Sequence, residues 1–98
     1  IWAMNDPSAL GATLAVQQAG LQDKIIVTGI DGSPEGVTEL KQKNSPFIGF
    51  ATQNPAEMVR QGVKAAQGII AGKPPTNSQI LIPSKLYTKD TINTYPGW

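Results

Sequence analysis

The sequence contains neither cysteine nor histidine. Without a thiol, the chain cannot form a disulfide, a thiolate zinc site or a cysteine nucleophile. Without an imidazole, it cannot hold a His-ligated metal or use a Ser-His catalytic pair. We therefore expect no metal and no cofactor, and these absences favour a binding function over an enzymatic one.

The chain also has almost no excess of one charge sign, because its eight Lys and Arg and seven Asp and Glu leave a net charge of +1. The basic residues are scattered along the chain, which provides no positive stripe for nucleic acid. Uninterrupted apolar runs last only a few residues, whereas a membrane-spanning helix needs about 20. Apolar residues still make up 40% of the 98 positions, as expected of one small globular unit.

Three short apolar runs each end in a polar cluster that contains a proline. They are "IWAM" before "NDP", "KIIVTGI" before "DGSP" and "FIGFAT" before "QNP". Proline is well tolerated at the first position of a helix, and the preceding residues Asp6, Ser33 and Asn54 are good N-cap types. The pattern predicts that each run is a strand leading directly into a helix.

Helices are expected at 7–18, at 34 to about 43 and at 55–71, where apolar residues recur at three- and four-residue steps. Gly20 and Gly72 follow the first and third ranges and are placed for left-handed caps. Two later stretches, "QILIP" and "KLYT", predict one or two short strands. The order β-α-β-α-β-α-β predicts an α/β protein with a parallel sheet and right-handed crossovers.

Polar side chains follow the predicted strands at the point where each strand ends. Asn5, Asp31 and Gln53 come from three separate segments, and the carboxyl ends of parallel strands meet at the edge where ligands bind. A carboxylate can accept from two adjacent hydroxyls, and amide groups both donate and accept. The set is a poor one for acid–base catalysis and suits a neutral polyol.

Each of these residues also has a simpler structural interpretation. Asp6 is favoured as a helix cap over a ligand group, which leaves Asn5 without an evident structural role. Asp31 could form a turn in "DG", although Ser33 is already the better cap of the next helix. Trp2 is expected in the core rather than as a sugar-stacking surface, because alternation along a strand points it away from the face of Asn5.

Together, "AMNDPSALGATLAVQQAG", "VTGIDGSPEGV" and "FATQNPAEMVRQGVKAAQGIIAGK" resemble the C-terminal third of periplasmic sugar-binding proteins of the ribose-binding type. The effector domains of LacI-type repressors look similar, but less so. The resemblance covers essentially the whole chain. It implies a two-lobed α/β fold that holds a sugar between its lobes, and it implies that Asn5, Asp31 and Gln53 contact sugar hydroxyls.

The resemblance also implies how the chain is organised. We expect a C-terminal fragment of a longer protein, since the chain begins inside a predicted strand. Residues 1–53 and about 86–98 would then belong to the C-terminal lobe, and residues from about 54 to 83 to the N-terminal lobe. The implied partners are a small sugar, the permease of an ABC transporter and the missing N-terminal part of the same protein. The implied compartment is the periplasm.

Three hypotheses follow from these observations. The first is a solute-binding protein of a sugar ABC transporter, and the second is the effector domain of a LacI-type regulator. The third is a doubly wound enzyme or phospho-acceptor domain with Asp31 as its acid, but no glycine-rich nucleotide-binding loop follows any strand. In an isolated chain, the apolar stripe of Val59, Val63 and Ile70 would lack a partner sheet.

Overall fold

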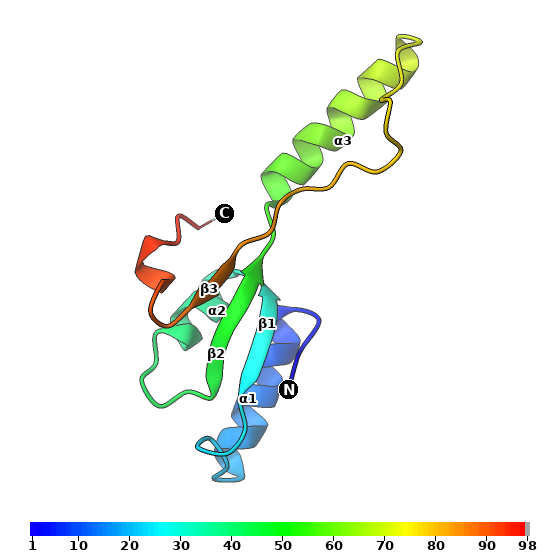
Figure 1. Cartoon of the computed structure of the whole chain (residues 1–98). Helices are drawn as coiled ribbons and strands as arrows, with labels where there is room; N and C mark the ends of the chain where they lie inside the picture. The colour runs from blue at the N-terminus through cyan, green and yellow to red at the C-terminus, as the bar shows by residue number, and fades with distance from the viewer. Residues whose placement is uncertain (98) are drawn as a thin grey trace.

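The computed structural model describes residues 1–97, and Trp98 lies outside the described residues. The elements alternate between helix and strand, which confirms an α/β fold (Figure 1). In chain order they are α1 (Asp6–Gln18), β1 (Val27–Asp31), α2 (Pro34–Leu40), β2 (Phe47–Thr52), α3 (Pro55–Ile70), β3 (Leu86–Thr88) and a 3-10 turn (Ile92–Thr94).

Helix α1 begins one residue earlier than the sequence predicts. Asn5 has an extended backbone, and its Oδ1 accepts a hydrogen bond from the N–H of Ser8 at 2.9 Å. Asn5 is therefore the N-cap, and Asp6 is the first helical residue. The prediction that Asp6 caps this helix while Asn5 has no structural role is wrong, because the carboxylate of Asp6 has backbone partners elsewhere in the fold.

The other two helices begin as predicted. Ser33 caps α2 and Asn54 caps α3, each accepting from the N–H three residues further on at 3.0 Å. Gly20 and Gly72 adopt φ angles of 66° and 71° after α1 and α3, which confirms the left-handed caps. Helix α2 ends at Leu40, before the predicted end near residue 43.

The sheet has the order β1-β2-β3 and is mixed rather than wholly parallel. Strands β1 and β2 are parallel, with Asp31 opposite Thr52 at their carboxyl ends. Strand β3 is antiparallel to β2, with Tyr87 opposite Phe50. The prediction of a parallel sheet is thus wrong for β3, because the chain leaves the sheet through α3 and returns from the far end in the opposite direction (Figure 1).

Two predicted strands do not form within the described residues. Residues 1–4 contribute only an isolated parallel bridge between Trp2 and Thr28, and Trp2 is 73% exposed rather than in the core. Residues 79–83 form no strand, although the pattern predicts one there. A strand needs a neighbouring strand for its backbone hydrogen bonds, and this segment runs beside a helix instead (Figure 1).

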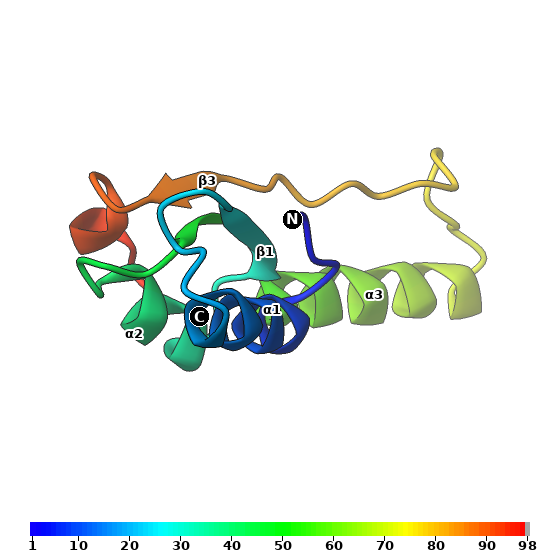
Figure 2. The same cartoon turned by 90° about the horizontal axis from the view of Figure 1, so that it is seen from below.

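The core lies between the sheet and the helices on one of its sides. Figure 2 shows α1 and α2 on the same side of the sheet. Phe47 and Phe50 of β2 are fully buried, with their ring centroids 6.4 Å apart. The buried apolar residues are Ala3, Ala9, Val16, Val27, Leu40, Phe47, Phe50, Tyr87 and Ile92.

The remaining part of the chain extends away from this core. We call residues 1–53 and 85–97 the body, and residues 54–84, which contain α3 and the returning segment, the arm (Figure 1). The radius of gyration is 17.2 Å, whereas a compact chain of this length has about 13 Å. No residue of α3 is buried, and its Val59, Val63 and Ile70 are exposed, which confirms that this stripe lacks a partner.

None of the described helices is long and apolar enough to cross a bilayer.

Candidate functional site

The predicted site residues lie where β1 and β2 end. The N–H of Gln53 donates to the backbone oxygen of Asp31 at 3.0 Å, which extends the parallel pairing by one step. The Gln53 side chain then turns back, and its Nε2 donates to Oδ1 of Asp31 at 2.9 Å. A carboxylate from one strand and an amide from the next are therefore in direct contact at the sheet edge.

Asn5 reaches the same edge through its neighbour in the chain. The N–H of Asp6 donates to Oδ2 of Asp31 at 3.2 Å, so each oxygen of the Asp31 carboxylate accepts from a different segment. Asn5 and Asp31 are half-buried, and Gln53 is exposed. Because Oδ1 of Asn5 caps α1, a ligand contact by Asn5 would come from its Nδ2 group.

Asp6 has a different role from the helix cap that its sequence position predicts. Its side chain is fully buried, and its Oδ2 accepts from the N–H groups of Gly32 at 3.1 Å and Ser33 at 2.8 Å. Burial raises the pKa of the Asp6 carboxyl, and the nearby Asp31 charge adds to this, while the hydrogen bonds from Ser33 and Gly32 oppose it. The carboxylate therefore ties α1 to the turn after β1.

Two glycines make room for this buried carboxylate. A Cβ on Gly29 would lie 2.6 Å from Oδ1 of Asp6, and a Cβ on Gly36 would lie 2.3 Å from its Oδ2. Both distances are shorter than side-chain contacts allow, so any larger residue would displace Asp6. The glycines around "GIDGSPEG" were the available sequence signal that a side chain from elsewhere enters this turn.

The turn after β1 contains a residue in an unusual conformation. Asp31 has φ of 134°, and it is the one residue other than glycine with positive φ among residues 1–97. Such conformations persist where the surrounding structure holds them, and they occur often at functional sites. Asp31 is thus a strained residue at the position where the sequence predicts a ligand contact.

Tyr95 contacts the same turn from the C-terminal tail. Its hydroxyl donates to the backbone oxygen of Gly32 at 2.9 Å. Burial raises the pKa of this hydroxyl, and the charge of Asp6 and the neighbouring Tyr87 raise it further. Tyr95 is a residue of this turn that no sequence motif indicated.

The two chain crossings between body and arm lie next to Gln53. The N–H of Thr52 donates to the oxygen of Lys85 at 2.9 Å, and the N–H of Lys85 donates to Oγ1 of Thr52 at 3.0 Å. The hydroxyl of Ser84 donates to the oxygen of Thr52 at 2.9 Å. A cleft of about 160 Å³ lies beside this junction, and its walls include Gln53 and Tyr95.

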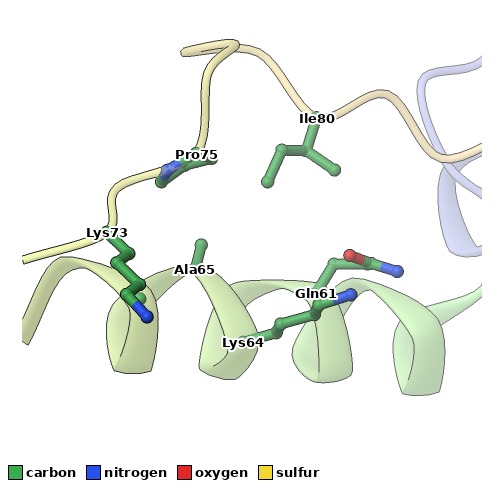
Figure 3. A pocket seen from close by; sticks show the side chains of 7 residues that line it. Gln61, Lys64, Ala65, Lys73, Pro75 and Ile80 are labelled. Atoms are coloured by element: carbon green, nitrogen blue, oxygen red, sulfur yellow. The ribbon is translucent and has the colours of Figure 1, made fainter. Parts of the chain in front are cut away.

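A larger hollow lies away from these residues, in the arm. It has a volume of about 440 Å³ and lies between α3 and the returning segment, where Ala65 and Ile80 face each other (Figure 3). No predicted site residue lines it. Its walls have no carboxylate, and no group of three or more potential metal ligands occurs in the described part of the chain. The Asp31 carboxylate and the Gln53 amide therefore meet at the sheet edge, away from the larger hollow.

Comparison with known proteins places this chain in a family. Residues 1–74 match a family described as "Periplasmic binding protein domain". The chain belongs to this family. The ribose import binding protein RbsB of Salmonella typhimurium is 36% identical over 73 residues, which are 74% of this chain and 24% of that protein. The chain thus spans about a quarter of the length of the curated relatives it matches.

Solved structures of the family match the fold along almost the whole chain. An ABC transporter solute-binding protein from Agrobacterium vitis with bound allitol has a TM-score of 0.87 and 34% identity, over 96% of this chain and 32% of that one. A periplasmic solute-binding protein from Actinobacillus succinogenes with bound D-allose has a TM-score of 0.80 and 30% identity, over 97% of this chain and 33% of that one. These similarities confirm that the chain forms part of a periplasmic-binding-protein fold.

Proposed function

We propose that this chain is part of the solute-binding component of a sugar ABC transporter. The protein binds a monosaccharide-like polyol and does no chemistry on it. The observation that carries the proposal is the contact between the Asp31 carboxylate and the Gln53 amide at the carboxyl ends of parallel strands, 2.9 Å apart. The allitol and D-allose in two similar structures support a polyol as the ligand class.

The hydrogen-bonding capacity of the site suits vicinal hydroxyls. An ionised carboxylate has about four acceptor positions. Oδ1 and Oδ2 of Asp31 each accept from a protein N–H group and lie at the edge where a hydroxyl would approach, and hydrogen bonds to a carboxylate are the stronger kind. Gln53 can accept through Oε1 and Asn5 can donate through Nδ2, which together match hydroxyls in either orientation.

We propose that body and arm belong to two lobes of a longer protein. Residues 1–53 and about 86–98 would form part of the C-terminal lobe, with residue 98 outside the described residues, and residues from about 54 to 83 part of the N-terminal lobe. The two hydrogen-bonded crossings at Thr52 and the exposed apolar face of α3 support this division. The rest of the N-terminal lobe would cover α3, and the polyol would lie between the lobes.

The lobe division predicts the behaviour of the isolated chain. Small domains that leave apolar surface uncovered are marginal, so the chain should associate with copies of itself or need its companion segment. Size-exclusion chromatography with mass spectrometry measures this directly. A stable 10.4 kDa monomer with well-dispersed NMR signals would contradict the division.

The remaining partners follow from the transporter assignment. We propose the membrane permease of an ABC transporter as the protein partner and the periplasm as the compartment. The ribose import binding protein of Salmonella typhimurium supports an importer. No observation favours the alternative of a LacI-type regulator.

The test is a ligand titration of the complete protein that contains this chain. A thermal-shift screen of pentoses, hexoses and hexitols identifies a binder, and calorimetry then compares wild type with Asp31→Asn. Loss of a charge-assisted hydrogen bond costs about 1.5–3 kcal/mol, so the affinity should fall at least tenfold. The control is Asp23→Asn, which removes an exposed carboxylate outside the site. Unchanged affinity in Asp31→Asn would refute the site assignment.

A further inference from the structure

We propose that Asp6 and Tyr95 are positioning residues that fix the Asp31 carboxylate for ligand binding by holding Gly32 from both sides. Asp6 accepts from the N–H of Gly32 at 3.1 Å, and Tyr95 donates to its backbone oxygen at 2.9 Å. The N–H and the backbone oxygen of Gly32 thus each form a hydrogen bond with a side chain from a distant part of the chain. We call this arrangement the Gly32 clamp. The inference rests on the proposed function, in which Asp31 contacts the polyol.

The clamp acts on the residue next to a strained one. The N–H that Asp6 binds belongs to the peptide unit joining Asp31 to Gly32, and Asp31 has φ of 134°. A residue other than glycine rarely adopts this region, and it keeps such a conformation only when its surroundings hold it. Without the clamp, Asp31 would relax toward an ordinary backbone conformation, and its carboxylate would leave the edge it shares with Gln53.

Asp6 contacts both the strained residue and the residue that follows it. Its Oδ2 binds the turn after Asp31, and its own N–H donates to Oδ2 of Asp31 at 3.2 Å. One residue of α1 therefore fixes both the backbone after Asp31 and the direction of its carboxylate. A residue that served only to cap α1 would do neither, and Asn5 already performs the capping.

The burial of Asp6 indicates a role beyond packing. Its Oδ1 has no hydrogen-bond partner among the described residues, and a fully buried carboxylate is costly unless its contacts compensate. An apolar side chain would fill the same space without that cost but could not accept from Gly32 and Ser33. The buried acid Asp6 therefore lies where the backbone N–H groups of Gly32 and Ser33 point toward one oxygen.

The space for the clamp depends on glycine on both sides. A Cβ on Gly32 would lie 2.4 Å from the Tyr95 hydroxyl, and Gly29 and Gly36 leave no room for a Cβ beside Asp6. Gly32 itself has φ of 79°, a conformation that glycine adopts readily. The turn after β1 is thus shaped to admit one side chain from α1 and one from the C-terminal tail.

The test measures polyol affinity by calorimetry in the complete protein, using a polyol identified by the screen. Asp6→Ala removes both acceptor contacts and should weaken binding at least tenfold. Asp6→Asn should restore most of the affinity, because its amide oxygen can still accept from Gly32 and Ser33. Tyr95→Phe removes one hydrogen bond and should weaken binding about fivefold. The matched control, Thr38→Val, removes a hydroxyl-to-carbonyl bond of 2.8 Å on α2 and should leave affinity unchanged.

A double-mutant cycle separates positioning from general stability. If Tyr95 acts through Asp31, then Tyr95→Phe should have no further effect on affinity in an Asp31→Ala background. An equal loss in both backgrounds, or no loss in either, would overturn the clamp even if Asp6→Ala failed to fold. If Asp31→Ala itself bound every polyol normally, the proposed function and the clamp would both fail. If Asp31→Ala weakened binding while Tyr95→Phe did not, only the clamp would fail.

Discussion

The body and the arm bury apolar surface to very different extents, although the arm helix carries the more pronounced apolar stripe. Every buried apolar residue of the core belongs to the body. Helix α3 is the longest described helix, with 16 residues, yet none of them is buried. Helix α1 consists largely of small residues and still buries Ala9 and Val16. An apolar stripe therefore shows that a helix has a face to cover, but it does not identify the covering segment.

The largest expected effect comes from the centre of the body. Phe50 is fully buried and contacts the rings of Phe47, Tyr87 and Tyr95, with centroid distances of 5.4–6.4 Å. Phe50→Ala should therefore lower the free energy of unfolding by about 3–5 kcal/mol. Urea denaturation of the complete protein measures this value. A loss below about 1 kcal/mol would mean that the body is not the packed half of the molecule.

A matched pair of glycines sharpens the comparison, because the same Gly→Ala substitution should lower stability in the body and raise it in the arm. Gly36→Ala places a Cβ 2.3 Å from the buried Asp6 carboxylate and should destabilise the body by about 1–3 kcal/mol. Gly62 of α3 has nothing within 4 Å, so Gly62→Ala should stabilise the helix by about 0.5–1 kcal/mol.

Circular dichroism during thermal unfolding of the isolated chain, at a fixed protein concentration, measures both glycine variants. Repeating Gly62→Ala in the complete protein then shows whether another segment packs on α3, since close packing there would remove the gain. If Gly36→Ala proved neutral, the buried position of Asp6 would be contradicted.

The smallest effect concerns pH and depends on the raised pKa of Asp6. A carboxyl whose pKa is higher in the folded state binds its proton more tightly there. Its contribution to stability is fully present below the ordinary value of 3.8 and is lost as the pH rises through the folded pKa. The unfolding free energy of wild type minus that of Asp6→Asn should therefore fall as the pH rises from about 3.8 toward neutrality. A difference that grew with pH would contradict the burial of this carboxyl.

Much of the fold could be predicted because its signals are local. The prolines and the cap residues Ser33 and Asn54 mark helix starts within a few positions, and the structure confirms them. The meeting of Asp31 and Gln53 followed from topology, since parallel strands β1 and β2 end at one edge. These inferences needed no knowledge of distant contacts.

The errors arose where the outcome depends on a distant partner. Asn5 and Asp6 are equally good caps by local rules, and the choice is decided by Gly32, 26 positions from Asp6. The contact of Tyr95 with Gly32 spans 63 positions. Trp2 was expected in the core but is 73% exposed, although its backbone forms a bridge with Thr28, and residues 79–83 were expected as a strand but form none. A local sequence pattern does not identify the distant segment with which a residue will pack or pair.

The most direct test of the account is amide hydrogen exchange of the complete protein with and without the polyol that binds best. The ligand should slow exchange at residues 5–6, 31–33 and 52–54, which form the proposed site. The outer turns of α3, near residues 62–70, should change little. Protection confined to α3, or none at the Asp31 turn under saturating ligand, would contradict the assignment of Asp31, Gln53 and Asn5 to a polyol site.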